Sequence, residues 1–146
     1  KTPDQKEDMR IVLSEHYRKW GLLDYVAGWF HKASTYFRKT QCSFAFVATN
    51  TVVQGQHVPN FWQDIISSEL KIIFGVRSFK WSNLATNEAG VSVVVVGLGK
   101  KKKSAFLYSE DQVIRTENIN GYLLPQKDFI LAVPQRVCTI QTDHNK

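Results

Sequence analysis

Residues 70–97 read LKIIFGVRSFKWSNLATNEAGVSVVVVG, and two apolar runs within this stretch predict buried strands. The runs, residues 70–76 and 91–97, are too short and too rich in β-branched side chains for helices. From Arg77 onward the sequence predicts an irregular loop that begins with two large aromatic and two cationic side chains. Because ligands of open α/β sheets collect at the carboxyl ends of strands, this loop is the predicted functional edge of the molecule.

The chain has the size and composition of one globular domain. Its 146 residues are 43% hydrophobic, which is enough to bury a core. A net charge of +6, from 19 basic and 13 acidic side chains, favours nucleic acid or another polyanion as partner, although ordinary domains can be equally basic. No segment approaches the ~20 apolar residues of a membrane span and no signal-peptide pattern opens the chain, so a cytoplasmic location without membrane contact is expected. Because the chain opens at Lys1 and not at Met, it is expected to be a piece of a longer protein.

Several classes of chemistry lack their motifs. Cys42 and Cys138 have neither CxxC nor Cys/His spacing, which predicts a reduced compartment without a zinc site, and Cys42 is expected to be a small core residue. The histidines are scattered without a carboxylate at ligand spacing, so no metal site is expected. No GxSxG, GxGxxG or Walker sequence occurs, which argues against a serine hydrolase and against phosphate-cradling loops.

The rest of the chain predicts alternating helices and strands. Helices are predicted for residues 3–17, 22–37 and 58–69, and a further strand for residues 41–49. This order is typical of an α/β fold and suits half of a doubly wound sheet. The lysine run at 100–103 is interpreted as a solvated connection, with a phosphate contact as the alternative. Residues 104–108 and 112–116 are candidates for short strands, and the remainder is expected to be a connection to another module.

The loop after residue 76 carries the residues best suited to bind a ligand. Phe79, Lys80 and Trp81 are predicted to face the polar turn at residues 50–56 across the same edge of the sheet. Flat aromatic side chains beside cations suit a nucleobase and its phosphates. An enzyme that modifies a base inside a duplex must flip the base into such a pocket. The alternative is that these aromatic rings cap the core beneath a loop.

Several stretches resemble MmeI-like adenine-specific DNA methyltransferases. Residues 44–58, FAFVATNTVVQGQHV, resemble that family's FVSTNSxxQGEQV signature, and residues 77–83, RSFKWSN, resemble its RTFKWSNEA segment. Residues 5–10 (QKEDMR) and 24–29 (DYVAGW) are similar to the stretch after the family's catalytic motif, and residues 119–123 (INGYL) to its INPYL, with Gly121 in place of Pro. The resemblance runs from about residue 5 to residue 124.

This resemblance implies a partial Rossmann-like mixed sheet that belongs to an S-adenosylmethionine-dependent methyltransferase. The family's glycine-rich cofactor loop and its Asn-Pro-Pro-aromatic motif are absent from this chain. The resemblance therefore implies the C-terminal half of the catalytic domain at residues 1–99, and a connection toward the target-recognition domain at residues 100–146. Strands five, six and antiparallel seven would be residues 41–49, 70–76 and 91–98.

The resemblance also implies roles for individual residues in the transfer of a methyl group to the exocyclic amino group of adenine. Phe79 is the expected stacking partner of the flipped adenine and Trp81 the reserve candidate. Lys80 and Arg77 would contact the flanking DNA backbone.

Two further pairs of residues are weaker candidates. Tyr25 and Trp29 would border the adenine of the cofactor, with a plain core role as the alternative. Asn50 and Gln54 would line the DNA pocket.

The implied partners are double-stranded DNA and the missing N-terminal half of the domain, in the cytoplasm of a bacterium with a restriction-modification system. Without that half, the strand at residues 41–49 would expose an apolar edge, so association into a homo-oligomer is expected through this edge or through the helix faces that the missing half would cover. The chain alone is expected not to methylate DNA. The alternatives are a non-catalytic DNA-binding module and an inactive remnant.

Overall fold

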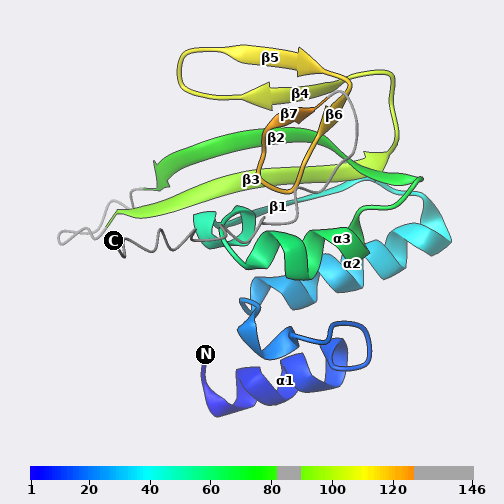
Figure 1. Ribbon diagram of the computed structural model, residues 1–146, viewed down its shortest axis with the longest axis vertical. Coiled ribbons are helices and arrows are strands. Elements are labelled where there is room, and N and C mark those ends of the chain that lie inside the picture. Colours follow the sequence, from blue (N-terminus) through cyan, green and yellow to red (C-terminus); the bar gives the residue numbers. More distant parts are fainter. Residues whose placement is uncertain (82–89, 127–146) are drawn as a thin grey trace, which may run out of the picture.

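Five strands form one mixed sheet, and helices lie against one of its faces (Figure 1). This computed structural model describes residues 1–81 and 90–126. The strands are β1 Phe44–Thr49, β2 Leu70–Trp81, β3 Val91–Lys100, β4 Ala105–Tyr108 and β5 Val113–Thr116, in the spatial order β1-β3-β2-β4-β5. A separate strand pair is formed by β6 Asn118–Ile119 and β7 Pro125–Gln126. The predicted α/β class with a mixed sheet is therefore confirmed.

Strand β3 pairs antiparallel with both of its neighbours. Val96 lies opposite Phe46 of β1, and Val95 lies opposite Val76 of β2. Strands β1 and β2 therefore run in the same direction with β3 between them, and β4 pairs parallel with β2. The valines of β3 favour an extended backbone because their branched side chains fit a pleated surface. The strand predicted at residues 91–98 is confirmed and continues to Lys100.

The first helix, α1 Pro3–Leu13, is shorter than predicted. Thr2 supplies the N-cap of a capping box, and Pro3 at the first helical position suits the start. After Leu13 the chain tightens into a turn, in which the His16 amide donates to the Leu13 carbonyl. Tyr17, which was predicted to end this helix, is buried in the core beyond that turn. The predicted C-terminal end is therefore wrong, because burial of the Tyr17 ring takes precedence over continuing the helix.

The second helix, α2 Val26–Thr40, begins and ends later than the predicted residues 22–37. A separate 3-10 turn, η1 Trp20–Leu22, precedes it. Gln41 ends the helix in a left-handed conformation, with φ of 58°, and turns the chain toward β1. The Phe30 ring lies 5.0 Å from the ring of Phe46 on β1, so this helix packs on the sheet.

Residues 58–69, predicted as one helix, form a shorter and irregular helical segment. A π-helical turn, η3 Val58–Trp62, continues into a single α-helical turn, α3 Gln63–Ile65. Ile66 already has an extended backbone. The prediction is wrong beyond Ile65, because a turn at residues 67–70 leads the chain into β2.

Strand β2 continues five residues past the predicted end at Val76, which corrects the predicted loop. Residues 79–81 pair with residues 91–93 at the start of β3, with Trp81 opposite Val91. A bulge between Val76 and Phe79 accommodates the extra residues. Pairing with a long partner strand thus overrides the polar local sequence. The rest of the predicted loop, Ser82 and Asn83 included, lies outside the described residues.

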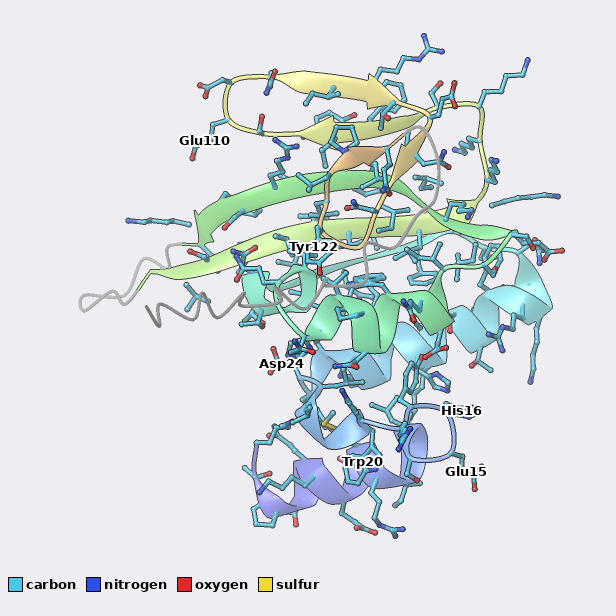
Figure 2. All side chains as sticks on the ribbon, in the orientation of Figure 1. Glu15, His16, Trp20, Asp24, Glu110 and Tyr122 are labelled. Carbon is cyan, nitrogen blue, oxygen red and sulfur yellow. The ribbon has the colours of Figure 1, made fainter. Side chains whose placement is uncertain are left out.

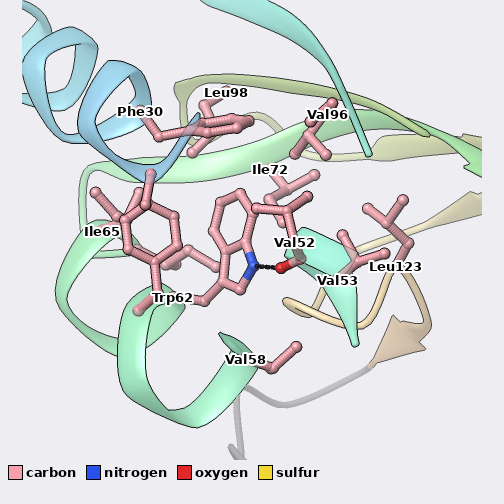
Figure 3. Packing of buried hydrophobic residues seen from close by; sticks show 14 of the residues in the cluster. Phe30, Val52, Val53, Val58, Trp62, Ile65, Ile72, Val96, Leu98 and Leu123 are labelled. Carbon is pink, nitrogen blue, oxygen red and sulfur yellow. Dashed lines mark hydrogen bonds between the residues drawn. The ribbon is translucent and has the colours of Figure 1, made fainter. Parts of the chain in front are cut away.

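The core centres on Trp62, which is fully buried (Figure 3). Its indole Nε1 donates to the carbonyl of Val52 over 2.8 Å, and its ring centroid lies 5.2 Å from those of Phe30 and Phe61. Other buried members include Leu13, Leu23, Phe37, Val58, Ile65, Ile72, Val94, Val96, Leu98, Leu107 and Leu123. Helices and strands therefore share one continuous apolar interior.

The chain after residue 100 still belongs to this structure. The predicted short strands at residues 104–108 and 112–116 are confirmed as β4 and β5, which extend the sheet beyond β2. Ile119 and Leu123 enter the common core. The boundary predicted after residue 99 stays a prediction, with paired strands on both sides of it. Residues 127–146, with Cys138, lie outside the described residues.

One expectation about the cysteines is wrong. Cys42 is exposed two residues before β1 begins, and it is not a core residue. None of the helices in residues 1–81 and 90–126 has the length and apolar character needed to cross a bilayer.

Candidate functional site

Strands β1 and β2 end at the same edge of the sheet, where β3 begins. Val93 of β3 lies between Thr49, the last residue of β1, and Phe79 near the end of β2. The polar turn after β1 therefore lies one strand away from the aromatic residues of β2. The sequence analysis placed these two groups at a common edge, and the register brings them there.

Phe79 and Trp81 form an aromatic pair at this edge. Their ring centroids are 6.5 Å apart, and the ring planes are inclined by 51°. They lie opposite Val93 and Val91, on alternate residues of β2, and thus on the same face of the sheet. Phe79 is half-buried and Trp81 is 49% exposed, and neither belongs to the buried core. Aromatic surface is therefore accessible to a ligand.

The two predicted cations at the end of β2 have different surroundings. Lys80 is exposed, and because it lies between Phe79 and Trp81 on β2, its side chain points to the opposite face of the sheet from the two rings. Arg77 is half-buried, and its Nε donates to the carbonyl of Leu123 over 3.3 Å. Because Leu123 belongs to the core, Arg77 attaches the segment after β6 to the sheet. The structure therefore leaves Lys80 exposed at this edge but on the other face of β2 from the aromatic pair, and it directs the Arg77 guanidinium to Leu123.

The turn after β1 is a 3-10 helix, η2 Asn50–Val53. Asn50 is half-buried, and Gln54, just after the turn, is exposed with an extended backbone. The Thr51 hydroxyl bonds to the Thr49 hydroxyl and donates to the carboxylate of Asp24. Asp24 (Figure 2) immediately precedes Tyr25, so the turn is attached to the start of α2.

His57 completes a polar cluster that the sequence analysis missed. Its Nε2 lies 3.9 Å from Asp24 Oδ2, while its Nδ1 is buried and has no hydrogen-bond partner among the described residues. The pKa of His57 is lowered from its ordinary value, chiefly by burial. The nearby Asp24 carboxylate opposes this shift, and the charge of Lys1 adds to it. The histidines were set aside because none had a carboxylate at ligand spacing. Asp24 and Thr51 are 27 positions apart in the chain, so local spacing gave no signal for this cluster.

Tyr25 and Trp29, the predicted cofactor residues, line one hollow between α1 and α2. The hollow has a volume of about 280 Å³, and its lining also includes Asp8, Met9, Ile11, Val12, Gly28 and Lys32. The Tyr25 hydroxyl donates to Asp8 Oδ2 over 2.9 Å, and this bond raises the pKa of Tyr25. Trp29 is 54% exposed. The lining includes neither Phe79 nor Trp81, so these predicted sites are separate among the described residues.

The two regions suit different parts of a nucleotide-like ligand. An aromatic pair with an adjacent lysine can stack on a base and attract its phosphate. The hollow beside Trp29 offers apolar surface with a carboxylate and an ammonium group at its rim. Within residues 1–81 and 90–126, no group of three His, Cys, Asp or Glu side chains is placed to hold a metal ion.

Comparisons with known proteins identify this chain as part of a DNA-methyltransferase domain. A family model described as "MmeI, DNA-methyltransferase domain" matches residues 1–109. DNA methyltransferase A of Bacillus subtilis (strain 168) is 32% identical over 131 residues, which are 88% of this chain and 15% of that protein. The solved structure of the type IIL restriction-modification enzyme MmeI in complex with DNA matches with a TM-score of 0.80 and 34% identity, over 89% of this chain and 18% of that one.

This chain belongs to the MmeI DNA-methyltransferase domain family. The resemblance inferred from residues 44–58 and 77–83 is thereby confirmed. The chain spans less than a fifth of the length of these two relatives.

Proposed function

We propose that this chain forms the target-base side of an adenine-specific DNA methyltransferase in a bacterial restriction-modification system, acting in the cytoplasm. One observation carries the proposal: Phe79 and Trp81 stand as an accessible aromatic pair at the edge where β1 and β2 end, with the exposed Lys80 between them along β2 on the other face. Membership in the MmeI family supports methyl transfer to DNA. Adenine as the target comes from the resemblance of residues 44–58 and 77–83 to adenine-specific members.

Each residue at the edge has a proposed role toward double-stranded DNA. Phe79 stacks on the flipped adenine, and Trp81 flanks it or the neighbouring base. Lys80 neutralises the adjacent phosphate. Asn50 and Gln54 approach from the turn after β1, one strand away. Arg77 contributes less than Lys80 to contact with the DNA backbone, because its guanidinium already donates to the Leu123 carbonyl.

The proposed cofactor is S-adenosylmethionine, which supplies an activated methyl group when bound. The hollow at Tyr25 and Trp29 fits part of it, because an exposed aromatic ring with neighbouring aliphatic side chains suits a flat adenine ring. Held at Tyr25 and Trp29, the cofactor would supply the methyl group that the adenine amino nitrogen accepts, with the thioether of S-adenosylhomocysteine as leaving group and loss of one proton from the nitrogen. The contribution of this chain is to hold the base in the attacking orientation, and such positioning supplies much of the acceleration.

The remaining groups are proposed to come from an N-terminal half of the domain. The sequence contains neither a glycine-rich cofactor loop nor an Asn-Pro-Pro-aromatic motif to bind the amino group. In this assignment β1, β2 and β3 are the fifth, sixth and seventh strands of a Rossmann-like sheet. The outer edge of β1 has no pairing strand among the described residues and would receive the fourth strand, or a second copy of the chain in its absence.

Fluorescence of a base analogue tests the stacking role with the chain as it is. A short single-stranded oligonucleotide carrying 2-aminopurine is titrated with the protein, and stacking quenches its fluorescence. Phe79→Ala is expected to weaken binding about 5- to 100-fold, the usual value of a stacked base. Tyr36→Ala, which removes an exposed ring from α2, is the matched control and should leave binding unchanged. Equal effects of the two substitutions would overturn the stacking role.

A chimaeric enzyme tests the reaction itself. The matching segment of the Bacillus subtilis relative is replaced by this chain, and the methylated nucleoside is identified by mass spectrometry. N6-methyladenine is the expected product, while this chain alone yields none. A different methylated base would refute adenine specificity. Methylation by the isolated chain would refute the need for the N-terminal half.

A further inference from the structure

Cationic side chains gather at the end of the sheet that lies away from the candidate site. The lysines at 100–103 end β3 and lead into β4, Lys71 lies at the start of β2, and Arg115 lies opposite Phe106 near the start of β4 (Figure 1). We call these six residues the basic end. The lysines at 100–103 and Arg115 are exposed. The sequence analysis noted only the lysine run, and the fold adds two further cations to it.

The topology of the sheet holds the lysine run in place. Strands β3 and β4 lie on either side of β2, and the end of β3 shares one end of the sheet with the starts of β2 and β4. Residues 101–104 therefore cross the start of β2 over two strand spacings, about 10 Å. The Lys101 amide donates to the Glu69 carbonyl over 3.0 Å. The lysines thus form a row across the end of the sheet and are not a free loop.

The fold brings like charges together at this end. Burial lowers the pKa of the half-buried Lys71, and the charge of Lys101 lowers it further, so the two ammonium groups lie near each other. The Arg115 Nε donates to the Ser104 hydroxyl over 3.0 Å, which directs its guanidinium toward the same connection. Among the described residues, no carboxylate forms an ion pair with the lysines at 100–103. Such a grouping of cations is unfavourable on its own and is stabilised when an anion binds.

The distribution of charge along the sheet attracts an anion to the basic end. Glu110 and Asp111 lie in the turn at the far end of the β4–β5 hairpin (Figure 2). Glu69 and Glu117 are the acidic residues next to the basic end in the chain, so cations outnumber carboxylates there. A surface of one predominant charge raises the local concentration of ligands of the opposite charge and steers them to it.

The basic end is well separated from the candidate site. Strand β3 reaches from Val91, which lies opposite Trp81, to Lys100, which lies opposite Leu70. The 10 residues of this strand span about 30 Å. A ligand bound at the basic end therefore does not occupy the space beside the aromatic pair.

We propose that the basic end binds the phosphate backbone of double-stranded DNA and forms a second DNA contact of this chain, independent of base sequence. The choice of DNA rests on the proposed function, and the charges themselves define a polyanion. The ammonium groups and the guanidinium neutralise phosphates, and the release of condensed counterions drives binding. Because phosphate contacts carry no sequence information, this contact is the same at every DNA sequence.

The salt dependence of duplex binding tests the proposal with the chain as it is. A fluorescein-labelled DNA duplex is titrated with the protein, and fluorescence anisotropy gives the association constant at several salt concentrations. The triple substitution Lys101→Gln, Lys102→Gln and Lys103→Gln is expected to reduce the steepness of log association constant against log salt concentration by about 2–3, since each phosphate contact contributes about 0.9. The duplex affinity at low salt should fall about tenfold or more.

A matched control separates the site from net charge. Lys6→Gln, Arg18→Gln and Lys19→Gln together remove three exposed cations from the helical side, and this variant should keep the salt slope of the unchanged chain. Circular dichroism verifies that both variants are folded. Equal losses in the two triple variants would overturn the proposal. An unchanged duplex affinity in the variant at residues 101–103, with loss of its binding to polyglutamate or to phosphatidylserine vesicles, would also overturn it and favour an acidic protein or a membrane surface.

A second readout distinguishes this proposal from the stacking role of Phe79. The triple substitution at residues 101–103 should leave the quenching of 2-aminopurine at saturating protein unchanged, while Phe79→Ala should leave the salt slope of duplex binding unchanged. Unaltered quenching in Phe79→Ala refutes the stacking role alone. An unaltered salt slope in the variant at residues 101–103 refutes the DNA contact of the basic end alone.

Discussion

Trp62→Phe tests whether the core hydrogen bond to Val52 holds the turn of the candidate site in place. Trp62 is fully buried, and its indole donates to the Val52 carbonyl over 2.8 Å. Val52 belongs to η2, the turn that also carries Asn50 and Thr51. A phenyl ring in this position keeps most of the apolar contact but has no donor. The substitution therefore leaves a carbonyl of the turn unpaired inside the core.

The expected loss of unfolding free energy follows from two contributions. An unpaired buried carbonyl costs about 2 kcal/mol. Phenylalanine also buries two carbon atoms fewer than tryptophan, which lowers the unfolding free energy by about 1.6 kcal/mol at the usual value for a methylene group. A total near 3–4 kcal/mol corresponds to a fall of about 10 °C in Tm for a chain of this size.

Urea unfolding followed by circular dichroism measures this loss. Trp29→Phe is the matched control, since Trp29 is 54% exposed and the same exchange there should change stability by less than about 0.5 kcal/mol. Hydrogen exchange of the amides at residues 50–53 should accelerate in Trp62→Phe more than exchange in β3. A change below 1 kcal/mol, or uniform acceleration across the protein, would refute the reasoning.

Three further predictions concern packing, pH and the polar cluster. Gly121→Ala should lower the free energy of unfolding by about 1–3 kcal/mol, because its Cβ would lie 2.8 Å from the Trp62 ring. Gly28→Ala, with open space around it, should raise it by up to about 1 kcal/mol in the same urea unfolding assay. Burial lowers the pKa of His31 and of His57 below the ordinary 6.5, so the unfolded chain binds these protons more readily than the folded protein. Their contribution to stability is complete above pH 6.5 and is lost as the pH falls through the lowered pKa values. Tm should therefore decline on acidification, and it should decline less steeply in His31→Gln than in the unchanged protein. Equal slopes of Tm against pH in the two proteins would contradict this. Thr51→Ala removes the hydroxyl bonded to Asp24 and should cost about 1 kcal/mol, while Thr35→Ala on the exposed side of α2 should be neutral or slightly stabilising.

Local sequence predicted the strands well where their composition left no alternative. The valines of residues 93–96 and the short runs at 104–108 and 112–116 form strands as predicted. The end of β2 could not be predicted, because residues 77–81 are polar and aromatic, and the pairing of residues 79–81 with residues 91–93 is a tertiary effect. Helix ends failed for a similar reason: burial of Tyr17 and the turn at residues 67–70 depend on neighbours distant in the chain.

The candidate site was predictable only in its coarse location. The carboxyl ends of two strands that run in the same direction must share an edge, and this rule placed the turn at residues 50–56 near Phe79. Spacing could not reveal that Asp24 joins Thr51 and His57, since these residues meet only in the folded chain. Nor could it show that Arg77 faces Leu123 while Lys80 stays exposed.

The position of β3 between β1 and β2 has a consequence for biosynthesis. Phe44 pairs with Leu98, so β1 leaves the ribosome long before its partner has been translated. Until β3 is translated, β1 and β2 have no strand between them to pair with. Nascent chains therefore expose both strands to chaperones and to other nascent chains. A premature stop codon ahead of β3 therefore removes every strand that pairs with β1 or β2 and does not merely shorten the sheet.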